Sequence, residues 1–365
     1  MKFIDLLNQN KIIRSNVHNS INRIMNSSSY IMGEDVMKLE QELKKINKSK
    51  YCITVSSGTD ALLIALMALG ISKGDEVITT PFTWISTAEV IKLLGAKPIF
   101  VDVELETCNM NLDLIASKIS KRTKAIIGVS LFGQMYDVKK MSQISKKYKI
   151  PVIEDGAQSF GAKYKNILSC NSSLIGCTSF FPTKPLGGYG DGGAIFTNNR
   201  RISNICKQIR VHGQKQKNDY RRLGINGRMD SIQCAIVLEK LKIFRKELVL
   251  RNNIANYYLS KLKKISVDDI VPISKTKNHF NVWAQFTIIV KNKKRNDLKK
   301  YLSNFKIPTA VYYPKSLDRI KFFQSKYKYK ISNLLSGQVL SLPMSPYLKK
   351  KDQDFIIKKI FDFYK

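Results

Sequence analysis

Residues 55–70 have the sequence VSSGTDALLIALMALG, which combines the end of a strand, a turn and a helix. The strand is expected to end at Ser56 and Ser57, Gly58 permits a tight turn, and Thr59 begins the helix. A strand that leads into a helix in this way is typical of a parallel sheet covered by helices. The free N–H groups of the first helical turn would suit a phosphate, although a Gly-Thr pair serves equally as an ordinary helix start.

Short β-rich runs alternate with longer helical segments from about residue 50 to residue 200. This alternation predicts an α/β fold with a mainly parallel sheet of seven strands and with amphipathic helices between the first five. The expected strands are Ile53–Ser56, Val77–Thr80, Pro98–Val103, Lys124–Leu131, Val152–Asp155, Cys177–Phe181 and Gly193–Thr197.

The rest of the chain predicts a second, smaller α+β domain. A long helix is expected from an N-cap at Asp230 to about Leu262, and it leads into that domain. Beyond it we expect strands at Trp283–Val290 and Thr309–Tyr313 and helices at Asn296–Phe305 and Lys350–Tyr364. The predicted division is a large domain of residues 1–245 and a small domain of residues 246–365.

The composition is that of a folded globular protein, with 44% hydrophobic and 25% charged residues. The N-terminus lacks the pattern of a secretory signal, and the longest apolar stretch, from Ala61 to Ile71, is well short of the roughly 20 residues of a membrane-spanning helix. The six cysteines form no C-x-x-C pair, which argues against a disulfide framework and a zinc knuckle. We therefore expect a cytoplasmic protein without a bound metal or a membrane span.

The net charge of +34 would by itself suggest nucleic-acid binding. The lysines, however, are spread over almost every predicted helix, and the chain is also rich in Ile and Asn, which indicates compositional drift. We expect no dedicated nucleic-acid surface, and we interpret the densest basic cluster, Lys291 to Lys300, as a solvated helix start.

Two further segments carry candidate catalytic side chains. In PVIEDGAQSFGA, residues 151–162, a strand ends at Glu154 and Asp155, where open α/β sheets place their ligands. In GCTSFFPTKPLGGYGDGGAIFTN, residues 176–198, Lys184 lies between two prolines and before glycines that allow a bulky group to approach. Taken singly, the aspartate could be a turn or helix cap, and the lysine one solvated lysine among many.

Together these segments resemble the fold-type-I pyridoxal-phosphate enzymes and, more narrowly, the DegT/DnrJ/EryC1/StrS family of sugar aminotransferases. The resemblance spans nearly the whole chain and includes SSGTDAL, GDEVITTPFTWISTA, GAKPIFVDV, VSLFGQ, IPVIEDGAQSFGA, TSFFPTKPLGGYGDGGAIFTN, RVHGQ and RLGINGRMDSIQ. It implies pyridoxal 5′-phosphate as the cofactor.

The resemblance also implies residue roles. Lys184 would form the internal Schiff base and later move the substrate proton, and Asp155 would keep the pyridine nitrogen protonated. The expected cofactor-binding residues are Gly58, Thr59 and Ser179 at the phosphate, Gln158 near the phenolic oxygen, Trp84 stacked on the ring, and Asn226 reaching the phosphate of the neighbouring subunit. The active sites would thus be shared in a homodimer.

Four residues are expected to bind substrate: Tyr30, Arg228, Tyr312 and Tyr313. Arg228 is a candidate for gripping a carboxylate, and the alternative is a structural ion pair with Asp230 or another acid. Tyr30 could line the sugar entrance or simply pack. Tyr312 stands where the most similar subgroup has a histidine, which leaves the identity of the sugar open. His212 matches the family pattern, but such a histidine more often caps or packs than catalyses.

Within the family, the chain looks most like the enzymes that act on carbon 3 of a keto-sugar. The resemblance therefore implies transfer of an amino group from L-glutamate to carbon 3 of UDP-2-acetamido-2-deoxy-3-oxo-glucuronate, for bacterial surface polysaccharide. One alternative is amination of carbon 4 of a dTDP- or UDP-linked 4-keto sugar. The dehydratase branch of the family is disfavoured because a histidine replaces the lysine there. A third alternative is an inactive regulatory or nucleic-acid-binding relative, which would be expected to have lost residues such as Lys184 and Asp155.

Overall fold

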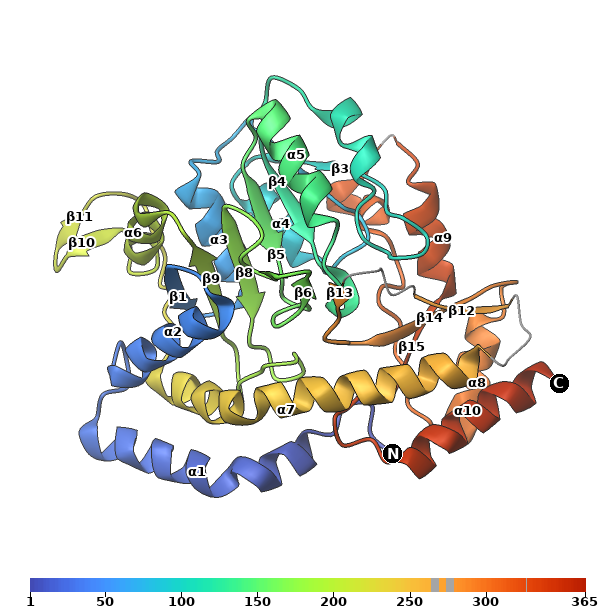
Figure 1. The fold of residues 1–365 in the computed structure, drawn as a ribbon. Helices are drawn as coiled ribbons and strands as arrows, with labels where there is room; N and C mark the ends of the chain where they lie inside the picture. The colour runs from blue at the N-terminus through green and yellow to red at the C-terminus, as the bar shows by residue number, and fades with distance from the viewer. Residues whose placement is uncertain (264–268, 274–278, 326) are drawn as a thin grey trace.

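The computed structural model describes residues 1–263, 269–273, 279–325 and 327–365. Its centre is a seven-stranded sheet with the order β1-β9-β8-β5-β4-β2-β3 (Figure 1). The strands are β1 (Tyr51–Val55), β2 (Glu76–Thr79), β3 (Lys97–Phe100), β4 (Thr123–Val129), β5 (Val152–Asp155), β8 (Ile175–Ser179) and β9 (Gly193–Thr197). Only β9 runs against its neighbours, which confirms the predicted mainly parallel sheet.

Helices cover both faces of this sheet because successive strand side chains point to opposite sides. Ile126 of β4 belongs to a core with α2 (Glu34–Asn47), α5 (Val138–Tyr148) and α7 (Ser231–Leu262). Its neighbour Ile127 belongs to the core on the other face, which includes α3 (Gly58–Ala68), α4 (Ser86–Leu93) and α6 (Arg200–Ile209). Buried strands of this kind are almost continuously apolar, which is why the sequence pattern identified them.

Most predicted elements are confirmed, with shifts of one to three residues at their ends. The exception among the connections lies between β3 and β4, where a helix was expected. The structure has only the short 3-10 turns η1 (Leu112–Leu114) and η2 (Ala116–Lys118) there. The side chain of Asn111 accepts a hydrogen bond from the Asp113 N–H and starts η1, and Cys108 has a positive φ of 58°. Such local side-chain bonds favour turns over a continuous helix.

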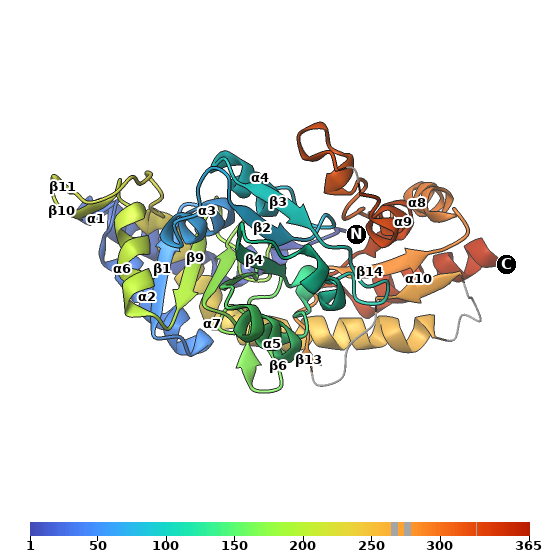
Figure 2. The same cartoon turned by 90° about the horizontal axis from the view of Figure 1, so that it is seen from above.

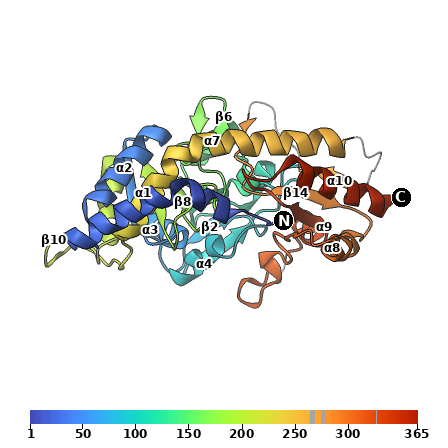
Figure 3. The same cartoon turned by 90° about the horizontal axis from the view of Figure 1, so that it is seen from below.

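The helix α7 is the longest element and begins as predicted, because the Asp230 side chain accepts a hydrogen bond from the Gln233 N–H at 2.7 Å. A further helix, α1 (Leu6–Ser27), lies alongside it (Figure 3). Neither α1 nor α2 was predicted. The division at residues 245 and 246 remains a proposal, and α7 runs across it.

The C-terminal part forms a second sheet, β12-β14-β15, grouped with α8 and α10 at one end of the molecule (Figure 2). Its elements are β12 (Ile270–Pro272), β14 (Phe286–Val290), β15 (Val339–Leu342), α8 (Arg295–Asn304), α9 (Lys330–Gln338) and α10 (Lys350–Tyr364), with the turns η4 (Leu317–Arg319) and η5 (Lys321–Phe323). The strand predicted at Thr309–Tyr313 is wrong. Only Ala310 forms a bridge, to Ser341, because the next residues turn toward a cavity.

The remaining short strands form two peripheral sheets. They are β6 (Lys163–Tyr164), β7 (Ile167–Leu168) and β13 (His279–Phe280) in one sheet, and β10 (Gln214–Gln216) and β11 (Asp219–Tyr220) in the other. Among the described residues, no helix combines the length and the apolarity that crossing a bilayer requires.

Candidate active site

A cavity of about 460 Å³ opens at the carboxyl edge of the central sheet. The strands β1, β2, β4, β5 and β8 all run in the same direction, so the loops that follow them meet at this edge. That is where open α/β sheets bind ligands, and the volume lies in the usual range for a small-molecule site. The side chains of the C-terminal part close the cavity: Gln285, Tyr312 and Tyr313.

Asp155, the last residue of β5, is a buried carboxylate in the cavity wall. Its Oδ2 accepts a hydrogen bond from the Thr87 hydroxyl at 2.8 Å, and its Oδ1 accepts one from the Ala157 N–H at 3.2 Å. Burial raises the pKa of Asp155, whereas these two hydrogen bonds and the nearby Lys184 charge oppose the rise. Each oxygen keeps a lone pair for a cationic partner.

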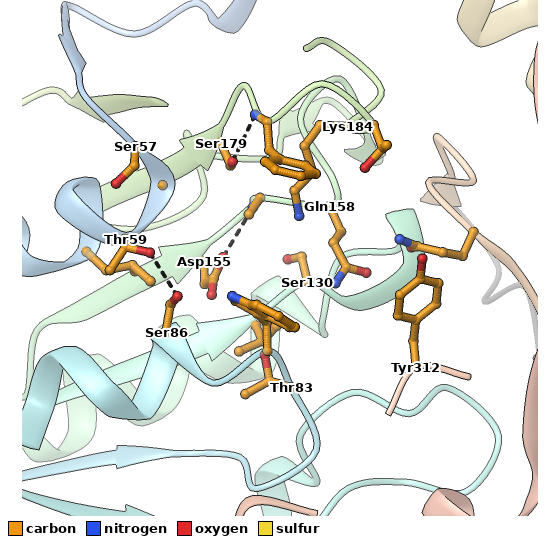
Figure 4. A pocket seen from close by; sticks show the side chains of 18 of the residues that line it. Ser57, Thr59, Thr83, Ser86, Ser130, Asp155, Gln158, Ser179, Lys184 and Tyr312 are labelled. Atoms are coloured by element: carbon orange, nitrogen blue, oxygen red, sulfur yellow. Dashed lines mark hydrogen bonds between the residues drawn. The ribbon is translucent and has the colours of Figure 1, made fainter. Parts of the chain in front are cut away.

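Lys184 lies in the loop between β8 and β9 and lines the same cavity (Figure 4). Its backbone N–H donates to the Phe181 carbonyl at 2.9 Å, which closes the turn that presents the side chain. Burial lowers the pKa of the Lys184 amine, and the charge of Asp155 partly offsets this effect. The two predicted catalytic residues are therefore brought to one cavity without an ion pair between them.

One end of the cavity is suited to a phosphate. The helix α3 begins there with Ser57 as its N-cap, so its first N–H groups and its positive dipole end face this region. The hydroxyls of Thr59 and Ser86 lie 2.8 Å apart, and Ser179 lines the same end. The chain passes from β1 to α3 at Gly58, as expected, but this glycine does not adopt a positive φ. It is required by space, because a Cβ there would lie 2.7 Å from the Cβ of Ser179.

The other end of the cavity is aromatic and amide-rich. Gln158 accepts a hydrogen bond from the Phe132 N–H at its Oε1 and donates one from its Nε2 to the Tyr313 hydroxyl, both at 2.9 Å. The Trp84 ring lies 6.3 Å from that of Tyr313, measured between centroids, and 59% of Trp84 is exposed. Tyr312 also lines this end (Figure 4).

Three predicted site residues do not line the cavity within a single subunit: Tyr30, Asn226 and Arg228. Asn226 is exposed, and Tyr30 uses its carbonyl to accept a hydrogen bond from the Ser231 N–H. The structural ion pair considered for Arg228 is not formed among the described residues, since Asp230 instead caps α7. The Arg228 Nε is buried and has no hydrogen-bond partner there.

Several residues of the cavity were not predicted from the sequence, among them Ser57, Ser86, Ser130 and Gln285. Thr87, which lies behind the cavity wall and donates to Asp155, was not predicted either. Thr87 belongs to the segment GDEVITTPFTWISTA, which is part of the family resemblance, so the sequence did indicate that it lies near the site. Nothing in the sequence indicated Gln285, because it lies in an ordinary apolar strand pattern far along the chain.

The chain matches the DegT/DnrJ/EryC1/StrS aminotransferase family from residue 11 to residue 361. It belongs to this family. The predicted resemblance and the predicted fold of a fold-type-I aminotransferase are thereby confirmed.

Individual relatives agree with this assignment. The UDP-2-acetamido-2-deoxy-3-oxo-D-glucuronate aminotransferase of Pseudomonas aeruginosa is 45% identical to the aminotransferase described here over 95% of this chain and 96% of that protein. The crystal structure of a DegT DnrJ EryC1 StrS aminotransferase from Brucella abortus has a TM-score of 0.95 at 36% identity and covers 100% of this chain and 99% of its own.

A third relative bears on the cofactor. The structure of ntda from Bacillus subtilis, described with bound cofactor PMP, has a TM-score of 0.92 at 29% identity, covering 99% of this chain and 82% of its own. The cavity of the aminotransferase fits such a group, because it combines a helix N-terminus, a buried carboxylate and a lysine. The expected pyridoxal-phosphate cofactor is therefore consistent with both the family and the site.

Proposed function

We propose that this aminotransferase uses pyridoxal 5′-phosphate to transfer an amino group from L-glutamate to carbon 3 of UDP-2-acetamido-2-deoxy-3-oxo-glucuronate. The observation that carries the reaction type is the placement of Lys184 and Asp155 in one cavity at the start of α3. The substrate is supported by the relative from Pseudomonas aeruginosa, which is 45% identical and is named for that sugar.

When bound, the cofactor supplies an aldehyde that condenses with amines and a ring that accepts the electrons released from the substrate carbon. Lys184 would hold it covalently through Nζ. With its amine free, Lys184 Nζ would accept the proton that leaves the substrate carbon and would later return it. Its lowered pKa favours the unprotonated amine that this role requires.

The remaining residues would orient the cofactor. The start of α3, with Thr59 and Ser179, would bind the phosphate, while Asp155 would hold a proton on the ring nitrogen. Gln158 has one amide N–H that is not used by Tyr313 and could donate to the phenolic oxygen. Trp84 would stack on the ring and lose much of its exposed area.

The residues outside the cavity suit a homodimer with shared active sites. Asn226 is exposed and would reach the phosphate of the partner subunit, and Tyr30 would line the partner's sugar entrance. Arg228 would bind the substrate carboxylate, a role supported by its buried Nε without a partner. Because all six cysteines are free and buried, the proposed location is the reducing cytoplasm, where the nucleotide sugar would be made for surface polysaccharide.

The test is to incubate the purified protein, pyridoxal phosphate and L-glutamate with 3-keto and 4-keto nucleotide sugars and to locate the new nitrogen by NMR. We expect amination at carbon 3. Lys184→Ala should lower the rate by at least roughly 10³-fold and abolish the absorbance of the lysine-bound cofactor, whereas the exposed control Lys139→Ala should change neither. Amination at carbon 4 would replace the proposed substrate, and an active Lys184→Ala variant would refute the proposed role of the lysine.

A further inference from the structure

Two glutamines line the cavity, and they differ in their hydrogen bonds to the rest of the protein. Gln158 has both ends of its amide bound within the protein, to Phe132 and Tyr313. Gln285 is different. Its Oε1 is buried and accepts no hydrogen bond from the part of the chain that the structure describes. Buried polar groups in proteins are nearly always paired, so a free amide in a cavity wall indicates a missing ligand.

The backbone before Gln285 is held tightly. The Val282 N–H donates to the Gly133 carbonyl at 3.0 Å, and the buried Arg251 donates to the Trp283 carbonyl at 3.1 Å. The two backbone segments are so close that Gly133 has no space for a side chain, since a Cβ there would lie 2.5 Å from the Trp283 nitrogen. The unpaired amide is therefore not a feature of a loose segment.

The position after Gln285 is equally defined. Phe286 begins β14 and pairs with Leu342 of β15. Gly133 belongs to η3 (Leu131–Gly133), and the neighbouring Phe132 N–H in the same turn holds Gln158. The turn η3, which follows β4, thus holds both the Gln158 amide and the segment that carries Gln285.

Gln285 comes from the C-terminal part, as do Tyr312 and Tyr313, whereas the phosphate end of the cavity is built by α3, Ser86 and Ser179. Gln285 therefore belongs to the side of the cavity that the C-terminal part forms, and not to the end at the start of α3. The neutral amide suits uncharged oxygen atoms, while the carboxylates of an amino-acid donor are better matched by arginine or lysine.

We propose that Gln285 is a specificity-determining residue for the acceptor, whose buried Oε1 accepts a hydrogen bond from a hydroxyl of the sugar ring and whose Nε2 donates one to a neighbouring sugar oxygen. The inference rests on the proposed function and adds a residue to it. A site that hydrogen-bonds a substrate hydroxyl discriminates strongly against analogues that lack it, because its own polar group is then left unpaired. Gln285 would lower the stability of the free protein and favour the correct sugar.

The test separates the two half-reactions by following the cofactor absorbance in single-turnover experiments. In Gln285→Met, which keeps the length of the side chain but removes both polar atoms, we expect kcat/KM for the keto-sugar to fall roughly 5- to 100-fold. The rate with L-glutamate should stay within about twofold, and Tm should be unchanged or higher because an unpaired buried group is removed. Gln285→Glu keeps the shape and an accepting oxygen but loses the Nε2 donor, so it should show a smaller loss that is again confined to the keto-sugar.

The matched control is Gln143→Met, an exposed glutamine on α5, which should leave both half-reactions unchanged. Equal sugar rates for the wild type and Gln285→Met, or an equal loss in both half-reactions, would overturn the role of Gln285 alone. If the wild-type protein itself transfers no amino group to any nucleotide-linked keto sugar, the proposed function fails and this inference fails with it.

Discussion

One neighbouring hydroxyl opposes the effect of burial on the pKa of Asp155 more than any other group does. The carboxylate is buried, which by itself raises its pKa, and Thr87 is the side chain that opposes this effect most. Thr87 is fully buried, and its hydroxyl also lies 3.2 Å from that of Thr83. Because Thr87 donates its proton to Asp155, it accepts from Thr83, so the two threonines form a short chain directed at the carboxylate.

This geometry predicts a pH effect in Thr87→Val, which keeps the shape but removes the hydroxyl. Losing a hydrogen bond to the charged form should raise the pKa of Asp155. As the pH is lowered, the variant should therefore begin to lose activity at a higher pH than the wild type does. On the acid side of the profile we expect kcat/KM to drop about 2- to 10-fold, with recovery at higher pH. Thr87→Ser should restore the wild-type profile. A loss that is equal at every pH would contradict this explanation.

At the scale of elements, α7 holds the loop that carries Lys184. The Tyr189 N–H donates to the Gln233 Oε1 at 2.9 Å, and the Lys240 Nζ donates to the Gly188 carbonyl at 3.2 Å. The Lys240 Nζ also lies 4.6 Å from the centre of the Tyr189 ring. Lys240 is only 2% exposed and has no ion pair among the described residues, so its charge is held at an energetic cost.

Lys240 should therefore make stability depend on pH. Burial lowers its pKa from 10.5 to about 8, which corresponds to roughly 3 kcal/mol. Between these values the unfolded chain binds the proton that the folded chain has released, so this group's destabilising effect is complete below about pH 8 and fades as the pH rises toward 10.5.

Thermal unfolding of Lys240→Met checks this sign. The Tm of the variant relative to the wild type should be higher at pH 7 than at pH 10, because Met removes the buried charge only where the charge exists. The same comparison with the exposed Lys139→Met should give no pH-dependent difference. If the Tm of the variant relative to the wild type instead increased with pH, the buried charged amine would stabilise the fold.

At the scale of the whole molecule, the cavity is closed by segments far apart in the chain. The Leu317 N–H donates to the Pro81 carbonyl at 2.8 Å, which ties the C-terminal part to the loop after β2. Large apolar side chains remain on the surface of the single chain, such as Trp84 at the cavity and Leu223, which is 88% exposed. Exposed apolar groups of this kind are typical of protein–protein interfaces.

Shared active sites predict complementation between two inactive variants. Lys184→Ala lacks the lysine, and Asn226→Ala lacks the residue proposed to reach the partner. In a mixed dimer, one site combines both defects and the other combines both intact residues. After unfolding and refolding an equal mixture, we expect about one quarter of the wild-type activity, because half of the dimers are mixed and each has one intact site. If the mixture is no more active than the separate variants, Asn226 does not act across the interface.

The sequence by itself determined the alternation of strands and helices and showed the two motifs that contain Asp155 and Lys184, whose catalytic roles stay a prediction. Both are local properties: apolar periodicity reports which face of an element is buried, and a motif is a group of residues that are close together in the chain. The strands β5 and β9 were predicted to the residue. The helix expected between β3 and β4 failed, since hydrogen bonds of short polar side chains there favoured turns.

Only the tertiary structure decided which distant side chains share a hydrogen bond. Thr87 meets Asp155 across 68 positions, and Gln158 meets Tyr313 across 155. Such pairs depend on sheet order and on how the C-terminal part packs, neither of which leaves a periodic trace in the chain. For the same reason the free amide of Gln285 could not be foreseen, because a missing partner is visible only once every neighbour is in place.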